Sequence, residues 1–203
     1  MEQEDINSFL YDLYADVSPM TISIACRKKH GIDDQAFVYG ESHLPSMPLI
    51  FQEIRPRQGE IFYDLGCGSG RLLLYAALSF SFAKCIGVEL LDDLVGIAKT
   101  KIEFCKTRLV ELSLPNMMSA VEVIHADFTK IDVSDADVIY IAATCFSNKF
   151  MRSLALSLAD QLTSGSRVIT LTKSLSTKQF RIKTSQLYPM EWGQTTVVFH
   201  ERI

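Results

Sequence analysis

The most constraining feature of the 203-residue sequence is a glycine-rich turn at residues 64–70, which reads Asp-Leu-Gly-Cys-Gly-Ser-Gly. A short apolar run precedes this turn, and a helical segment without charges follows Arg71. Between a strand and a helix, glycines let the backbone approach a ligand closely, and the free N–H groups of the first helical turn face the crevice at the strand ends. The turn therefore predicts an α/β fold with a ligand site at the carboxyl edge of its sheet.

Short apolar runs alternate with helical patterns after residue 60, which is typical of a parallel sheet with crossover helices. Strands are predicted at residues 61–63, 85–88, 121–124, 138–142 and 167–172, and helices at residues 71–80, 91–112 and 148–162. Two more strands, at residues 186–190 and 195–200, flank Gly193 and predict an antiparallel hairpin. Together these segments predict a Rossmann-like, mostly parallel seven-stranded sheet that closes with a C-terminal hairpin.

Residues 1–58 are predicted to form a helical extension of the main domain at residues 59–203. Apolar residues recur at helical spacing from Ile6 to Val17. Ser18 and Pro19 are typical of the N-cap and first position of a second helix, which Gly31 would end. A third helix is predicted at residues 48–54.

The composition is that of a globular chain, with 48% hydrophobic and 22% charged residues. Its net charge of −4 does not favour phosphate contacts with nucleic acid, although a basic cluster of Lys173, Lys178, Arg181 and Lys183 keeps that partner open. The longest uncharged stretch, residues 72–83, is shorter than the ~20 residues that span a bilayer, and the N-terminus is acidic where a secretory signal is basic. We therefore expect a cytoplasmic protein with no membrane partner.

The cysteines and histidines give no metal signal. Five cysteines are an odd number without a C-x-x-C pair, and the four histidines are scattered. We expect reduced thiols and no metal site.

The spacing of the turn distinguishes between nucleotide-like ligands. Dinucleotide sites use G-x-G-x-x-G, whereas this turn is G-x-G-x-G with a carboxylate two residues before it. Asp64 would repel a pyrophosphate but would attract a ligand with an ammonium or sulfonium charge. S-adenosyl-L-methionine carries both charges and is the expected cofactor.

Two further carboxylates occur where this cofactor needs acceptors. Glu89, at the end of the second predicted strand, is expected to accept the ribose hydroxyls. Asp127, after the third strand, is expected to accept the adenine amino group, with Phe128 stacked on adenine. The cofactor-binding residues predicted in this part of the chain are Asp64, Gly66, Gly68, Gly70, Arg71, Glu89, Asp127 and Phe128.

The segment Val38-Tyr39-Gly40-Glu41-Ser42 resembles the V-Y-G-E-T motif of the disruptor-of-telomeric-silencing (Dot) family, histone lysine methyltransferases without a SET domain. Further motifs occur in the family's order: Asp64-Leu65-Gly66, Gly87-Val88-Glu89, Asp127-Phe128, Phe180-Arg181-Ile182 and Trp192. The resemblance covers about residues 37–200 and implies a class I methyltransferase fold that acts on lysine. It also implies that Tyr39, Glu41 and Ser42 cover the methionine end of the cofactor.

The segment after the fourth strand departs from the family. Residues 142–146 read Ala-Ala-Thr-Cys-Phe where the family has Asn-Asn-Phe-Ala-Phe, so an asparagine of the family's transfer site is missing and Thr144 is the expected substitute. Because desolvation favours the neutral lysine amine, an apolar channel can replace a strong general base. Tyr39, Phe146 and Trp192 are the predicted aromatic wall, and with Thr144 they form the predicted catalytic set.

The sequence favours a protein-lysine methyltransferase whose partner is a histone or another lysine-bearing protein, with a nuclear location for a histone-directed eukaryotic enzyme. A small-molecule methyltransferase with a helical lid and a cofactor-binding module without catalysis remain open. RNA methylation is less favoured because no N-P-P-Tyr or D-P-P-Tyr motif is present.

Overall fold

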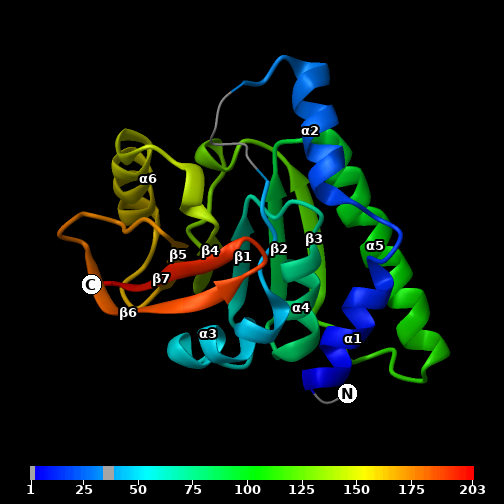
Figure 1. Cartoon of the computed structure of the whole chain (residues 1–203). Coiled ribbons are helices and arrows are strands. Elements are labelled where there is room, and N and C mark those ends of the chain that lie inside the picture. Colours follow the sequence, from blue (N-terminus) through cyan, green and yellow to red (C-terminus); the bar gives the residue numbers. More distant parts are fainter. Residues whose placement is uncertain (1–2, 34–38) are drawn as a thin grey trace.

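The computed structural model describes residues 3–33 and 39–203, so Val38 of the Val-Tyr-Gly-Glu-Ser segment lies outside the described residues. A seven-stranded sheet with the order β3-β2-β1-β4-β5-β7-β6 forms its centre (Figure 1). The strands are β1 (Ile61–Leu65), β2 (Lys84–Glu89), β3 (Ala120–His125), β4 (Val138–Ile141), β5 (Arg167–Leu171), β6 (Phe180–Met190) and β7 (Gly193–Arg202). Strands β1 to β5 pair in parallel, and β7 pairs antiparallel with β5 and β6. The predicted fold class is confirmed.

Helices cover both faces of this sheet. Helices α4 (Arg71–Ser79), α5 (Asp92–Glu111), α1 (Gln3–Leu13) and α3 (Met47–Ile54) contribute to one hydrophobic cluster, and α6 (Asn148–Gln161) contributes to another. The side chains of β1 alternate between the two clusters, with Phe62 in the first and Tyr63 and Leu65 in the second. The alternation confirms that β1 is buried between two helical layers.

The N-terminal helices belong to the same core as the sheet. Leu10 of α1 and Ile50 of α3 lie in one cluster with Leu73 of α4. Helix α2 (Pro19–His30) ends at Gly31, which adopts the predicted left-handed conformation with a φ of 65°. Ser18 is the predicted N-cap of α2, but its hydroxyl pairs with Thr21 Oγ1 at 2.9 Å instead of capping the helix.

Strand β6 is longer than the sequence predicts, since it begins at Phe180 and not at residue 186. Its first half is largely exposed and pairs only with β7, at the edge of the sheet. This part of β6 is held by hydrogen bonds to β7 and not by burial of its side chains. It therefore lacks the apolar pattern from which a strand is predicted.

Among the described residues, no helix is both long enough and apolar enough to span a membrane.

Gly87 in β2 lies where the backbone is crowded. An added Cβ would lie 2.7 Å from Cys67 Sγ and 2.7 Å from Leu73 Cδ2. We expect Gly87→Ala to lower the free energy of unfolding by about 1–3 kcal/mol, because the extra methyl overpacks the core. Urea denaturation followed by circular dichroism measures this change.

Gly96→Ala is the matched control. Gly96 is exposed on α5, and no atom lies within 4 Å of an added Cβ. Alanine there should raise the free energy of unfolding by about 0.5–1 kcal/mol through helix propensity. Equal stability of the two variants would contradict this account of Gly87.

Candidate functional site

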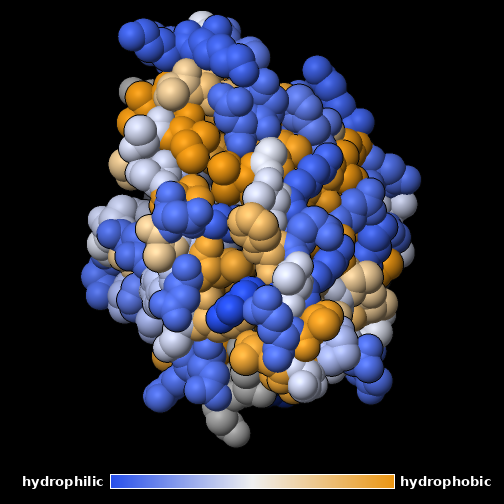
Figure 2. All heavy atoms as spheres, turned by 90° about the vertical axis from the view of Figure 1, so that its right-hand side faces the viewer, coloured by the Kyte–Doolittle hydropathy of each residue, from blue (hydrophilic) through white to orange (hydrophobic). Residues whose placement is uncertain are grey.

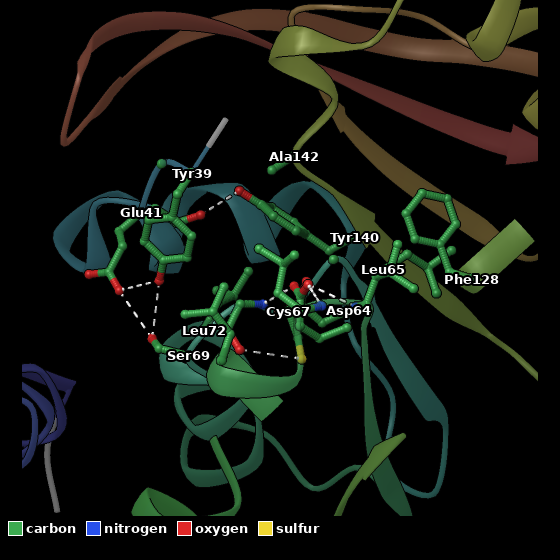
Figure 3. A pocket seen from close by; sticks show the side chains of 18 of the residues that line it. Tyr39, Glu41, Asp64, Leu65, Cys67, Ser69, Leu72, Phe128, Tyr140 and Ala142 are labelled. Carbon is green, nitrogen blue, oxygen red and sulfur yellow. Dashed lines mark hydrogen bonds between the residues drawn. The ribbon is translucent and has the colours of Figure 1, made fainter. Parts of the chain in front are cut away.

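A cavity of about 270 Å³ opens at the carboxyl ends of β1, β2 and β4, where the strand order reverses. Such reversals are the usual ligand sites of open α/β sheets. Figure 3 shows Tyr39 and Glu41 on one side of this pocket, Phe128 on the other and Asp64 between them. The N-terminal segment, three strands and their loops therefore share one site.

The glycine-rich turn forms the floor of the pocket. The amides of Gly66 and Cys67 donate to the Val88 carbonyl at 2.8 and 3.1 Å, which ties the turn to β2. Gly66 and Gly68 have positive φ angles of 88° and 55°, as the turn requires. At Gly68 an added Cβ would lie 2.6 Å from the Tyr39 ring. A glycine at this position therefore also leaves room for Tyr39 to pack on the turn.

Gly70, a predicted cofactor-binding residue, is not among the residues that line the pocket. An added Cβ there would lie 3.0 Å from Ala98 Cβ on α5. The third glycine therefore serves the close packing of α4 against α5.

Asp64 lines the pocket and is only 3% exposed. Its burial, together with the negative charge of Glu89, raises the pKa of its carboxyl group to about 8. A positive charge in the pocket would stabilise the ionised carboxylate. Asp64 is therefore positioned to favour a cationic ligand group.

Glu89 lines the same pocket from the end of β2 and is 8% exposed. Its carboxylate accepts backbone N–H bonds from Gly68, Leu90 and Leu91 at 2.9, 2.8 and 2.9 Å. Burial raises its pKa, and these bonds oppose that effect. Glu89 thus fixes the conformation of the glycine-rich turn. The sequence predicts a ribose contact for Glu89 but does not indicate this structural role.

Asp127 and Phe128 follow β3 and line the pocket as predicted. Asp127 accepts from Thr129 N and Thr129 Oγ1 at 3.0 and 2.7 Å, which fixes the short helix η3 (Phe128–Lys130). The centroid of the Phe128 ring lies 6.1 Å from those of Phe146 and Phe150, which also line the pocket. Phe146, predicted to form an aromatic wall with Tyr39, therefore lines the same pocket as Tyr39 and packs with Phe128 and Phe150.

The covering segment at residues 39–42 is held by polar contacts. The Tyr39 and Ser69 hydroxyls donate to Glu41 Oε1 at 2.6 and 3.1 Å, and Arg71 Nη2 lies 2.6 Å from Glu41 Oε2. Burial and the Glu41 charge raise the pKa of Tyr39 well above its usual range. Tyr39 is therefore favoured in its neutral form, which donates to Glu41.

Arg71 connects this segment to two other parts of the chain. Its Nη2 donates to the Ser42 carbonyl at 3.2 Å and lies 3.6 Å from Glu191 Oε1 in the β6–β7 turn. Its guanidinium also lies over the Tyr11 ring, 5.5 Å from the centroid. The first residue of α4 thus joins α1, the covering segment and the hairpin.

Trp192 lies outside the pocket lining and is 41% exposed, which corrects its predicted place in the aromatic wall. Its ring packs over Gly40, where an added Cβ would lie 2.8 Å from Trp192 Cε3. Its indole N–H donates to Thr195 Oγ1 at 2.9 Å. Trp192 therefore positions the covering segment from the hairpin.

The remaining predicted residue of the catalytic set, Thr144, lines the pocket from the short helix η4 (Ala143–Cys145). Tyr140 lines it too, and its hydroxyl lies 2.7 Å from Ser42 Oγ. Tyr140 is not among the residues predicted from sequence, because it lies within an apolar strand. A buried tyrosine needs a hydrogen-bond partner for its hydroxyl, so a tyrosine within an apolar strand is itself a sign of a polar contact at that position.

The strand order, the antiparallel hairpin and the carboxylates at successive strand ends define the class I methyltransferase fold. Solved structures agree with this class. An RNA methyltransferase from Salinibacter ruber, in complex with S-adenosyl-L-homocysteine, has a TM-score of 0.59 and 21% identity over 78% of this chain and 90% of that one. A point mutant of MtNAS, in complex with S-adenosylmethionine, has a TM-score of 0.61 and 18% identity over 96% of this chain and 77% of that one.

The family described as "Histone methylation protein DOT1" matches residues 27–191, and the chain belongs to this family. A histone-lysine N-methyltransferase, H3 lysine-79 specific, from Dictyostelium discoideum is 29% identical over 81% of this chain. A protein-lysine N-methyltransferase from Saccharolobus islandicus is 27% identical over 63% of this chain. The chain spans 9% of the length of the first relative and 75% of the second.

The ion pair between Arg71 and Glu41 gives a test of how the covering segment is held. Both side chains are largely buried, with 11% and 17% exposure. Arg71→Gln should lower the free energy of unfolding by about 3 kcal/mol, because it leaves a buried carboxylate without its partner. The double variant with Glu41→Gln should lose less than the sum of the single variants, as measured by urea denaturation.

Arg181→Gln is the control, since its side chain is 57% exposed in an ion pair with Glu201. Its expected cost is at most about 1 kcal/mol. Additive losses in the Arg71 and Glu41 variants would show that the two side chains do not act together.

Proposed function

We propose that the protein is an S-adenosyl-L-methionine-dependent protein-lysine methyltransferase. The observation that carries this proposal is that Asp64, Glu89 and Asp127, from three successive strand ends, all line one pocket. Membership of the DOT1 family supports it, as do the two relatives named above as lysine methyltransferases.

The donor set suits the proposed cofactor. Asp64 offers a buried carboxylate to a cationic group, and Glu89 and Asp127 offer acceptors for hydroxyl and amino groups. No protein atom lies within 4 Å of a Cβ added at Gly66, so the turn borders open space in the pocket. Phe128 supplies an apolar face beside Asp127. These residues match the needs of an adenosyl ligand with an amino-acid end.

When bound, the cofactor supplies a methyl group on a sulfonium centre, and transfer to an amine is an in-line displacement. The protein's contribution to such a step is chiefly positioning, which is worth up to about 7–11 kcal/mol in well-oriented systems. Within the described part of the chain, the pocket lining includes no histidine. An apolar approach that favours the neutral lysine amine therefore suits this site better than proton abstraction by a strong base.

Thr144, Tyr140 and Ala142 line the pocket beside the covering segment, with the Tyr140 hydroxyl bonded to Ser42. We place the acceptor amine at this side, where hydroxyl groups of Thr144 and Tyr140 can orient it. The acceptor is a lysine-bearing protein, and histones are the first candidates because of the H3 lysine-79 specific relatives.

Two carboxyl variants separate the two ends of the cofactor site. Asp64→Asn should weaken binding of S-adenosyl-L-homocysteine at least 10-fold but leave 5′-methylthioadenosine, which lacks the amino-acid end, almost unchanged, because Asp64 pairs with an ammonium group. Glu89→Gln should weaken both ligands, because it removes an acceptor for the ribose. Isothermal titration calorimetry measures these affinities.

The pH dependence of ligand affinity also tests whether Asp64 pairs with the ammonium group. The pKa of Asp64 is about 8 in the ligand-free protein, so the ionised form that an ammonium needs becomes populated only as the pH rises toward that value. Affinity for S-adenosyl-L-homocysteine should therefore increase up to about pH 8 in the parent protein and stay flat in Asp64→Asn. Parallel losses of both ligands in Asp64→Asn, without this pH difference, would contradict the assignment.

Radiolabelled S-adenosyl-L-methionine tests the acceptor class. The protein is incubated separately with histones, host-cell protein, total RNA and a metabolite extract. We expect label in protein, on lysine, and loss of that label when acceptor lysines are first acetylated chemically, because an amide nitrogen is not nucleophilic. Label confined to RNA or metabolites would refute the protein-lysine proposal, and binding without transfer to any fraction would show a cofactor-binding module.

A further inference from the structure

A second group of polar side chains joins α2 to the start of α5, outside the pocket. Cys26 Sγ and His30 Nε2 lie 3.1 and 3.0 Å from the same atom, Asp92 Oδ1. The three candidate donor atoms all lie within 4.8 Å of one another. Cys26 and His30 are one helical turn apart on α2, so they present a sulfur and a nitrogen to one point opposite a carboxylate.

The neighbouring charged side chains do not occupy the point where the three donor atoms meet. Lys29 Nζ pairs with Asp92 Oδ2 at 3.1 Å and with Asp93 Oδ1 at 3.4 Å, so it occupies the carboxylate oxygen that faces away from Cys26. The Asp93 carboxylate also interacts with the Cys26 thiol. A fourth oxygen donor is therefore at hand beside the three convergent atoms.

Few side chains of helix α2 are buried. Only Ser23 and Cys26 of this helix are buried, while Met20 and Ile24 are 55% and 53% exposed. Helix α2 lies alongside α5 (Figure 1), on a face where hydrophobic side chains lie among hydrophilic ones (Figure 2). The polar cluster at the end of α2 thus links the two helices, together with the apolar contacts of Ile22 and Cys26.

This link lies directly behind the pocket wall. Cys26 packs with Leu91 and Leu94, and Tyr39 packs against the same group. Leu91, Leu94 and Tyr39 all line the pocket. A displacement of α2 at Cys26 would therefore also displace side chains that line the pocket.

We propose that Cys26, His30 and Asp92 form a Zn²⁺ site that fastens α2 to α5. Thiolate, imidazole and carboxylate are the ligands that zinc takes in proteins, and bonds of roughly 2.0–2.3 Å need donor atoms as close as these. The Cys26 thiol releases its proton to solvent, and its sulfur lone pair forms the Zn–S bond. His30 donates through its neutral Nε2 and Asp92 through Oδ1, and a water or Asp93 completes four-coordination.

The charges of this site balance, since one thiolate and one carboxylate offset the two charges of the ion. Zinc binds the thiolate form of cysteine, so binding releases a proton from Cys26 and should tighten as the pH rises. No sequence pattern indicates this site, because Asp92 lies 66 residues from Cys26 and no C-x-x-C pair is present.

The test uses the full chain without an affinity tag, stripped of metal and titrated with Co²⁺ and then Zn²⁺. One equivalent of Co²⁺ should give a thiolate-to-metal charge-transfer band, and Zn²⁺ should abolish it. Cys26→Ser should lose the band, and both Cys26→Ser and His30→Gln should bind Zn²⁺ at least 10-fold more weakly in competition with a chromophoric chelator. Cys145→Ser, which changes a partly buried thiol outside the cluster, is the matched control and should behave as the parent.

Absence of a saturable band, or a band retained in Cys26→Ser, would overturn the proposal. Equal Zn²⁺ affinity of the parent, Cys26→Ser and His30→Gln would show an adventitious ion only. If Cys26→Ser does not fold, His30→Gln decides alone, because the His30 side chain is 43% exposed and its loss should be tolerated. S-adenosyl-L-homocysteine binding, measured on the same samples, separates a failure of the zinc site from a failure of the proposed function.

Discussion

The burial of two carboxyl groups at neighbouring strand ends is the constraint on which the site depends. Asp64 and Glu89 end adjacent parallel strands, and each would cost free energy in an apolar interior without compensation. For Glu89, three backbone N–H groups supply that compensation and fix the glycine-rich turn. For Asp64, burial and the Glu89 charge raise the pKa to about 8, so a cation beside it would stabilise the ionised form.

The covering segment depends on the glycine-rich turn. Glu41 accepts from Ser69 within this turn and pairs with Arg71 at the start of α4. Gly40 and Gly68 let Trp192 and Tyr39 pack closely on the backbone, where any larger residue would collide. The N-terminal segment therefore contacts both the glycine-rich turn and the C-terminal hairpin.

The pocket keeps the acidic residues expected of its family but differs where transfer would occur. Ala142, Ala143 and Thr144 stand where the resemblance places Asn-Asn-Phe. Two alanines present no side-chain hydrogen-bond groups, so Thr144 and Tyr140 are the polar side chains from this part of the lining. Thr144 and Tyr140 therefore lie on the proposed acceptor side of the pocket that Asp64, Glu89 and Asp127 also line.

Most of the fold was predictable because apolar periodicity and glycine spacing report local structure directly. The three acids could be assigned to one site from sequence because the carboxyl ends of parallel strands share one edge. Side-chain partners were not predictable in the same way. Phe146 packs against Phe128, and Trp192 packs over Gly40 outside the pocket lining.

The sequence by itself determined the alternating elements, the turn and the acids at the strand ends, since each depends on neighbours along the chain. Only the tertiary structure decided the pairs Tyr140–Ser42, Arg71–Glu41 and Cys26–Asp92, which join residues 98, 30 and 66 positions apart. Such contacts depend on how separate elements pack against one another. No local pattern encodes that packing, because it is set by the shape of the whole core.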